Sequence, residues 1–272
     1  MMGTDMRDIA ELFAPVKPGV SLVRLLGHKH VHLVISPHPD DDVIGAGGMM
    51  ALLAGSRRPV VVVYVTSGAP AGRFRSGVTL ARRGEALEAL RLIGARGAFF
   101  LPFTAQDVRA TPERVRALLM KIIRLAAPRA LYLPCPFERH ATHQAVTHMV
   151  VSGIRRQYPY EGELWGYGVW STLLPSSLVK RVDISRVVHL KRRAIERHVS
   201  QVAVKDYAAG VLGLNRHAAV FNFMLPDRKN IRYVEQFLDM RMLVQNRRLS
   251  IERFARQALF QAMVDVDAQS RP

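Results

Sequence analysis

The chain has 272 residues, 49% of them hydrophobic, which is enough to bury the core of one α/β domain and excludes an intrinsically disordered protein. No apolar run approaches the roughly 20 residues that a membrane-spanning helix needs. The 39 lysine and arginine residues against 22 aspartate and glutamate residues give a formal net charge of +17.

The basic residues occur in short groups spread along the chain, and none forms a low-complexity tail. This charge is compatible with a composition bias of the surface, with attraction to an anionic substrate or membrane surface, and with nucleic-acid binding. The single cysteine, Cys135, excludes an internal disulfide and a cysteine-based zinc site. Residues 1–17 lack the continuous apolar core of a signal peptide, so we predict a cytoplasmic protein.

Strand-like and helix-like segments alternate over the first two thirds of the chain. The predicted strands cover residues 32–36, 60–66, 98–101 and 130–133, and the predicted helices cover residues 43–53, 79–93, 112–127 and 142–154. Such alternation is typical of parallel β-α-β units. We therefore predict an α/β, Rossmann-like fold with a mostly parallel sheet and helices on both faces.

The alternation decays in the last third of the chain. One more strand is predicted over residues 179–184, whereas residues 188–202 and 230–263 have mostly helical patterns. We expect a single domain over residues 1–272, with a core at about 31–170 and a helical C-terminal portion at about 171–272.

An acidic cluster follows the first predicted strand, in the segment SPHPDDD at residues 36–42. Three adjacent carboxylates at the end of a buried strand repel one another unless a cation or hydrogen-bond donors neutralise them. His38 and Asp41 are three residues apart across a proline-stiffened turn, so both can reach one ion. The alternative is a polar loop in which Asp41 or Asp42 only caps the following helix.

Two histidines, His140 and His143, follow the fourth predicted strand at the start of a helix. Their spacing places both on one helical face. In parallel sheets ligands bind at the carboxyl ends of the strands, where both clusters lie. Together the clusters supply two histidines and one carboxylate, which is the donor set of a catalytic zinc site with an open position and also of non-haem iron enzymes.

The segment HLVISPHPDDDVIGAGGMMALLA, which contains the acidic cluster, resembles the first signature of the PIG-L/LmbE-like deacetylases. The segment HATH at residues 140–143 resembles their second signature, His-x-x-His. The segments TSG at 66–68, RRGE at 82–85 and KRRAIERHVSQ at 191–201 are similar to further motifs of the family. The order and spacing of these motifs agree over roughly residues 31–240.

This resemblance implies a role for each matching residue. His38, Asp41 and His143 would be the zinc ligands, with iron(II) as the alternative metal. Asp40 would be the general base, and His140 would assist the tetrahedral intermediate. The implied reaction is removal of an N-acetyl group from a GlcNAc-containing small molecule or glycoconjugate.

The resemblance also implies substrate-binding residues. Arg82 is expected to contact the substrate, and Asp107 is expected to bind a sugar hydroxyl. Arg73 and Arg75 lie in the Gly/Pro-rich loop that should border the site, so an anionic substituent on the substrate is a further prediction. One departure from the family pattern is Thr142, which replaces an acid often found between the two histidines and so removes a carboxylate partner for a histidine ring.

The function predicted from the sequence is thus that of a zinc-dependent N-deacetylase with a small amino-sugar substrate. The alternatives are a non-haem iron enzyme with the same donor set, and a basic protein that binds nucleic acid or membranes. For the deacetylase we expect no nucleic-acid partner, and the sequence allows a homo-oligomer. Tyr167 and Trp170 are candidates for the wall of a sugar pocket, with core packing as the alternative.

Overall fold

The computed structural model describes residues 2–28, 30–69, 76–221 and 230–269. Its elements are, in chain order, α1 (Met2–Ala10), β1 (Phe13–Pro15), α2 (Leu22–Leu26), β2 (His32–Ser36), α3 (Asp41–Gly55), β3 (Val60–Thr66), α4 (Ser76–Ile93), β4 (Gly97–Phe103), α5 (Ala105–Ala110), α6 (Pro112–Ala126), β5 (Ala130–Pro134), α7 (Ala141–Gln157), β6 (Glu163–Tyr167), β7 (Val179–Asp183), α8 (Val188–Glu196), α9 (Val199–Val202), α10 (Tyr207–Phe221), β8 (Val234–Asp239), α11 (Arg241–Gln245) and α12 (Ile251–Gln269). Within these described ranges, none of the helices combines the length and the hydropathy that crossing a bilayer requires.

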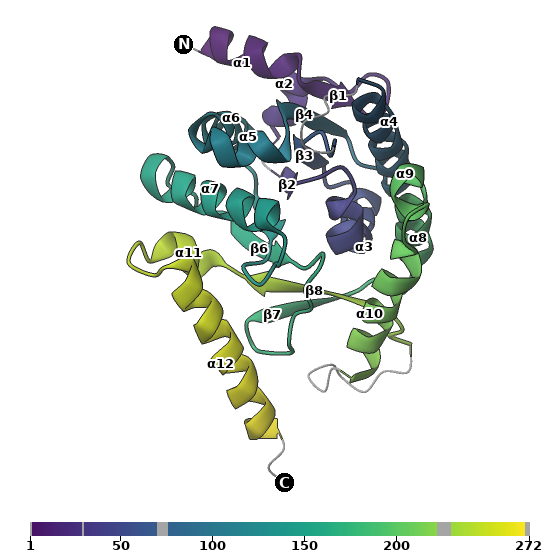
Figure 1. Ribbon diagram of the computed structural model, residues 1–272, viewed down its shortest axis with the longest axis vertical. Coiled ribbons are helices and arrows are strands. Elements are labelled where there is room, and N and C mark those ends of the chain that lie inside the picture. Colours follow the sequence, from purple (N-terminus) through teal and green to yellow (C-terminus); the bar gives the residue numbers. More distant parts are fainter. Residues whose placement is uncertain (1, 29, 70–75, 222–229, 270–272) are drawn as a thin grey trace.

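The strands of the described residues form one eight-stranded sheet in the order β1-β4-β3-β2-β5-β6-β8-β7 (Figure 1). Strands β4, β3, β2, β5 and β6 are parallel, whereas β1 and β8 pair antiparallel with their neighbours. The chain runs from β2 outward to β3 and β4, then returns to β5 on the other side of β2. The carboxyl ends of β2 and β5 therefore meet at the switch point of the sheet, where α/β proteins bind their ligands.

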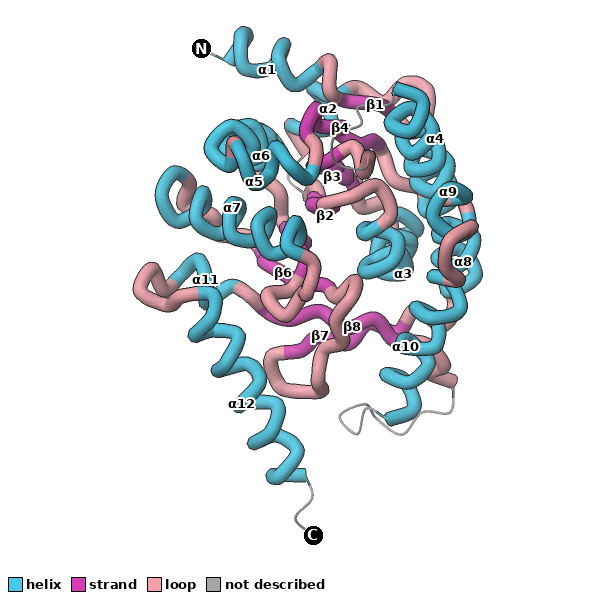
Figure 2. The backbone as a smooth tube through the Cα atoms, viewed as in Figure 1, coloured by secondary structure: helices cyan, strands magenta, loops and turns pink. Residues whose placement is uncertain are grey.

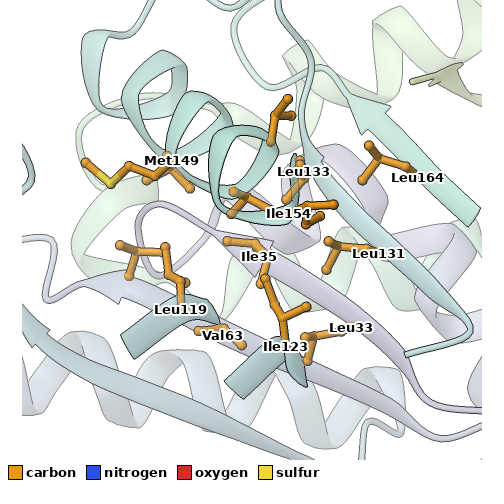
Figure 3. Close-up of a cluster of buried hydrophobic side chains, with 14 of the residues drawn as sticks. Leu33, Ile35, Val63, Leu119, Ile123, Leu131, Leu133, Met149, Ile154 and Leu164 are labelled. Atoms are coloured by element: carbon orange, nitrogen blue, oxygen red, sulfur yellow. The ribbon is translucent and has the colours of Figure 1, made fainter. Parts of the chain in front are cut away.

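Helices cover both faces of the sheet (Figure 2). Helices α3, α4, α8 and α10 pack together on one face, and α5, α6 and α7 pack together on the other. Because both faces are covered, the central strands are continuous apolar runs whose alternate residues point to opposite sides. Leu33 and Ile35 join the core cluster beside α6 and α7, which Figure 3 shows, whereas Val34 joins the cluster beside α3.

The structure confirms the predicted α/β fold with a mostly parallel sheet and helices on both faces. The predicted strands at 32–36 and 60–66 coincide with β2 and β3. The mostly helical interpretation of residues 230–263 is wrong at its start, where Val234–Asp239 forms β8 between β6 and β7. The C-terminal portion therefore completes the sheet as well as adding helices.

Helix α3 packs close to its neighbours because three of its buried residues are glycines: Gly45, Gly47 and Gly48. A Cβ atom on Gly45 would lie 2.2 Å from the ring of Tyr167, and one on Gly48 would lie 2.6 Å from the side chain of Ile184. Larger residues at these positions would push α3 away from the sheet, and with it the acidic cluster at its start.

A buried carboxylate of β8 also holds α3. Glu235 accepts hydrogen bonds from the backbone N–H groups of Gly48 (2.8 Å) and Met49 (2.7 Å). It also pairs with the buried Lys191 of α8, whose Nζ lies 2.7 Å from Glu235 Oε1. A buried charge is tolerated only when it is paired and hydrogen-bonded, as Glu235 is. These contacts join α3, α8 and β8 into one unit.

His32, at the start of β2, makes the stability of the fold sensitive to acid. The side chain is buried, and burial followed by the charge of Arg58 lowers its pKa from 6.5 to about 4. The unfolded chain binds a proton at His32 below pH 6.5, whereas the folded protein does not until about pH 4. The stability contributed by the neutral ring is therefore complete above pH 6.5 and is lost as the pH falls through this window. From about pH 7.5 to about pH 5, we expect His32 to lower the free energy of unfolding by about 2 kcal/mol.

Urea unfolding of the protein and of His32→Phe at the two pH values measures this effect. The variant should lose about 2 kcal/mol less stability on acidification, because phenylalanine cannot bind a proton. Equal losses in the two proteins would show that the folded state does not hold His32 neutral.

Candidate metal centre

Four of the predicted site residues come together at the switch point of the sheet. His38 lies in the loop after β2, and Asp41 is the first residue of α3. His140 immediately precedes α7, and His143 lies in its first turn, after the neighbouring strand β5. Two adjacent parallel strands thus bring together side chains that are 105 residues apart in the sequence, such as His38 and His143.

Three donor atoms of these residues are close enough to share one ion. Asp41 Oδ2 lies 2.9 Å from His38 Nδ1 and 3.1 Å from His143 Nε2, and the two ring nitrogens are 3.2 Å apart. Donor atoms at about 2.0–2.2 Å from a common zinc ion have separations of this size. The residues therefore fit a metal site of two histidines and one carboxylate.

The three histidines form a second, overlapping set. Ligand atoms of His38, His140 and His143 all lie within 4.8 Å of one another. The set that contains Asp41 fits better, because its atoms are closer together and because it supplies the negative charge that a dication needs. Asp41 is also buried, whereas His140 is exposed.

His140 is arranged as a hydrogen-bond donor. Its Nδ1 accepts a hydrogen bond from the backbone N–H of Thr142 (3.3 Å), so a neutral ring carries its proton on Nε2. The partial burial of its ring, followed by the charges of His38 and His143, lowers the pKa of His140 and favours this neutral form. The ring meets that of His38 edge to face, with 4.8 Å between their centres.

Glu138, which the sequence analysis missed, orients His143. Its side chain is buried, and its Oε2 lies 2.9 Å from His143 Nδ1, which leaves Nε2 of that ring facing Asp41. Its Oε1 accepts hydrogen bonds from the backbone N–H groups of Val169 (2.7 Å) and Ser171 (3.2 Å). The carboxylate that the family pattern places between the histidines is thus supplied from two residues before them. An acid two residues before a His-x-x-His pair is the signal that would have found it.

The electrostatics of the site favour a positive charge. Burial alone would raise the pKa of Asp41, but the charges of His143 and His38 outweigh it and hold that pKa well below its usual range. Burial alone would lower the pKa of His143, but Asp41 and Glu138 raise it to about 10. The two buried carboxylates of Asp41 and Glu138 face the one imidazole of His143 and need a cation to balance their charge. A divalent metal would supply that charge.

Glu138→Gln is expected to weaken zinc binding by about 10–100-fold. An amide N–H₂ group facing His143 Nδ1 would move the ring proton to Nε2 and block the lone pair that a metal needs. Chelator competition measures the zinc dissociation constant. Glu113→Gln, at an exposed position of α6, is the control, and its zinc dissociation constant should equal that measured for the unchanged protein. Unchanged affinity in Glu138→Gln would show that its carboxylate does not act on a metal ligand.

Asp40 lies beside the donor atoms in a strained backbone conformation, with φ 150°. Such strain persists only where surrounding contacts hold it, and it concentrates at functional sites. Asp40 Oδ2 accepts a hydrogen bond from Arg82 Nη2 (3.1 Å), and Arg82 also donates to the carbonyl groups of Pro39 (3.0 Å) and Gly68 (2.7 Å). Burial, followed by the charge of Asp41, raises the pKa of Asp40 well above its usual range.

The position of the Arg82 guanidinium also explains why the TSG motif contains a glycine. Gly68 has φ +68°, and a Cβ atom there would lie 2.3 Å from Arg82 Nη1. Only glycine adopts this conformation without cost and allows so close an approach. Arg82 thus ties the loop after β3 to the loop after β2.

A pocket of about 290 Å³, here termed the metal pocket, opens at these residues. Its lining includes His38, Asp40, Asp41, Arg82 and His140, together with Ile44, Val169, Trp170, Gln201 and Tyr207. Trp170 is 49% exposed and meets Tyr207 edge to face at 6.2 Å, an arrangement that offers apolar faces to a sugar ring. Tyr167 is instead part of the core, where its hydroxyl donates to the Ile35 carbonyl.

The structure does not bring every predicted substrate residue to the metal pocket. Asp107 closes a capping box with Thr104 at the start of α5, and it is not among the described residues that line the pocket. Arg82 does line the pocket, but its guanidinium is already hydrogen-bonded to the protein. Arg73 and Arg75 lie outside the described residues, so an anionic substrate stays a prediction.

The sequence is similar to characterised deacetylases. The family described as PIG-L: GlcNAc-PI de-N-acetylase matches residues 33–154. The diacetylchitobiose deacetylase of Thermococcus kodakarensis is 30% identical over 189 residues, which cover 62% of this chain and 69% of that protein.

Solved structures with a similar fold include the following two. The N,N'-diacetylchitobiose deacetylase from Pyrococcus horikoshii is 23% identical with a TM-score of 0.61, covering 81% of this chain and 87% of its own. The 4-carboxy-2-hydroxymuconate hydratase GalB from Pseudomonas putida KT2440 is 20% identical with a TM-score of 0.61, covering 78% of this chain and 96% of its own. At these identities the similarity concerns the fold alone, which also carries a reaction other than deacetylation. The family match runs from β2 to α7, and this chain covers 69% of a relative with which it is 30% identical. The chain therefore belongs to the PIG-L family of deacetylases.

Proposed function

We propose that this protein is a zinc-dependent hydrolase that removes the N-acetyl group from a GlcNAc-containing small molecule or glycoconjugate. The observation that carries the proposal is the meeting of three donor atoms, from His38, Asp41 and His143, within 3.2 Å of one another beside the metal pocket. Membership of a deacetylase family supports the reaction, and the aromatic side chains of the pocket support a sugar substrate.

In this proposal His38, Asp41 and His143 hold the metal. A zinc ion bound there would supply a Lewis acid to the amide carbonyl and would acidify a water molecule. Asp40, which adjoins the donor atoms without being one of them, would accept the proton of the attacking water and pass it to the leaving amine. Its hydrogen bond with Arg82 holds the carboxylate in place for both transfers.

His140 would stabilise the tetrahedral intermediate. Its Nδ1 is engaged with the backbone, so its Nε2–H is the group available to donate to a developing oxyanion. Such an interaction is typically worth on the order of 3 kcal/mol. A neutral ring suffices for this role, because the N–H group donates whether or not the ring is charged.

The metal is proposed to be zinc. Iron(II) is the alternative metal, because it accepts the same donors, and elemental analysis distinguishes the two. An iron oxygenase would in addition consume oxygen, which an oxygen electrode detects.

We further propose a cytoplasmic enzyme with a small-molecule substrate, formed by a single domain over residues 1–272. The pairing of β7 and β8 within the main sheet supports the single domain.

Incubation of the metal-loaded protein with a panel of GlcNAc conjugates, scored for released acetate, tests the proposed function. We expect release from at least one conjugate, loss of release with a chelator and its return with added zinc. No acetate from any conjugate at full metal occupancy would contradict the proposal. Addition of water to an unsaturated dicarboxylate by the same preparation would instead indicate a hydratase.

A further inference from the structure

A second cavity, of about 370 Å³, adjoins the metal pocket. It is lined by the loop after β6, by α10 and by β8, and it shares Ile44 and Val169 with the metal pocket. Helix α10 contacts both α3 and β8 on this face of the sheet (Figure 1). Ile44 lies three residues after Asp41 on α3, so part of the wall that the two spaces share lies beside a proposed metal ligand.

The chemistry of this second cavity differs from that of the whole chain. Its described lining contains no aspartate, glutamate, lysine or arginine, although the chain has a net charge of +17. Three large apolar side chains of the lining are exposed: Leu174 (51%), Leu214 (47%) and Phe221 (67%). Such exposure around one concave site is typical of a surface that a ligand covers.

One polar atom of the lining has no partner within the described residues. Asn215 Nδ2 donates to the Val234 carbonyl (3.0 Å), and because a carbonyl only accepts, the other amide atom must be the oxygen. This buried Oδ1 accepts no hydrogen bond from the described protein. A buried acceptor without a partner is costly, so a hydroxyl or amide donor on a ligand would relieve that cost.

We propose that this apolar cavity binds an uncharged, apolar aglycone of the amino-sugar substrate, while the acetamido group lies in the metal pocket. The inference rests on the proposed function: because the acyl group removed is acetyl, a larger apolar part of the substrate belongs to the aglycone. A volume of about 370 Å³ suits a single small-molecule group. The absence of cations from the described lining gives an anionic aglycone no partner there.

The test compares the octyl and methyl β-glycosides of GlcNAc as substrates of the metal-loaded protein. We expect kcat/KM to be at least about 30-fold higher for the octyl glycoside, because each methylene that leaves water contributes up to about fourfold. Leu214→Glu should remove most of this preference while the methyl glycoside is turned over as before. Val220→Glu is the matched control: Val220 is 55% exposed on the same helix, is not among the described lining residues, and should leave the preference intact.

Equal turnover of the two glycosides by the native protein would overturn the inference. Faster hydrolysis of N-octanoylglucosamine than of GlcNAc would also overturn it, because the apolar group would then be the acyl chain. Octyl glucoside, which has no amide, separates this inference from the proposed function. Calorimetric binding of octyl glucoside below its micelle concentration, weakened at least about 10-fold in Leu214→Glu, supports the cavity as the site even if no acetate is released. No binding overturns the inference even if the methyl glycoside is deacetylated.

Discussion

Asp40→Asn is expected to lower the rate of deacetylation by about 10²–10⁴-fold while the protein keeps its metal and its fold. The amide has nearly the shape of the carboxylate but cannot accept a proton from water. Its oxygen can still accept the hydrogen bond from Arg82, so Arg82 still joins the loop after β2 to the loop after β3. The measurements are kcat for acetate release, metal content by elemental analysis, and the thermal unfolding midpoint.

Asp42→Asn is the matched control for this prediction. Asp42 lies two residues after Asp40, is fully buried, and accepts a hydrogen bond from Tyr64 (3.0 Å). It is not among the described residues of the metal pocket. Burial raises the pKa of Asp42 to about 7, so its neutral amide should be tolerated and should leave most of the activity. If Asp40→Asn loses metal while Asp41→Asn keeps it, the roles of the two neighbours are reversed.

Alanine at His38, Asp41 or His143 is expected to reduce bound metal to a small fraction of one ion per chain and activity by at least about 10³-fold. Each substitution removes one of three donor atoms, and the Lewis acid they hold is worth several kcal/mol in the transition state. Elemental analysis after gel filtration measures the bound metal. Acetate release at equal protein concentration measures the activity.

His148→Ala serves as the control on the same helix. His148 lies on α7 with a half-exposed side chain that faces Glu252 on α12 at 3.6 Å, so metal content should not change. Full occupancy in any two of the three ligand variants would contradict the assignment. A loss of metal in His140→Ala as large as in Asp41→Ala would instead support the three-histidine set.

The meeting of the proposed metal ligands could be predicted because these residues lie in two short motifs, each directly after a buried strand. Residue type and spacing within each motif indicate the chemistry, and the rule for parallel sheets brings the motifs together. The residues that orient the proposed metal ligands and line the pocket follow no such local pattern. The Glu138 carboxylate is held by backbone N–H groups of residues 169–171, a contact between two loops that depends on the register of β5 and β6. Tyr207 reaches the metal pocket from α10, far along the chain.

The centre of the sheet was predictable for a similar reason, and its far edge was not. Strands β2 and β3 are unbroken apolar runs, whereas β6 is the segment ELWGY and β8 is the segment VEQFLD. A glutamate in the middle of a strand normally indicates an exposed face. Glu235 is buried only because Lys191 and two N–H groups of α3 neutralise it, and those partners come from other parts of the chain.

The contact between Glu235 and α3 has a consequence for how the protein folds. Gly48 and Glu235 are 187 residues apart, so this contact closes one of the largest loops of the chain. The family match ends at residue 154, and the segment 33–154 contains every proposed ligand but neither Glu235 nor the amides that hold Glu138. Contacts of such long sequence separation form late, after their loop entropy has been overcome. During refolding, high-affinity metal uptake should therefore accompany the last cooperative step, and an early intermediate built from the central strands should bind metal only weakly.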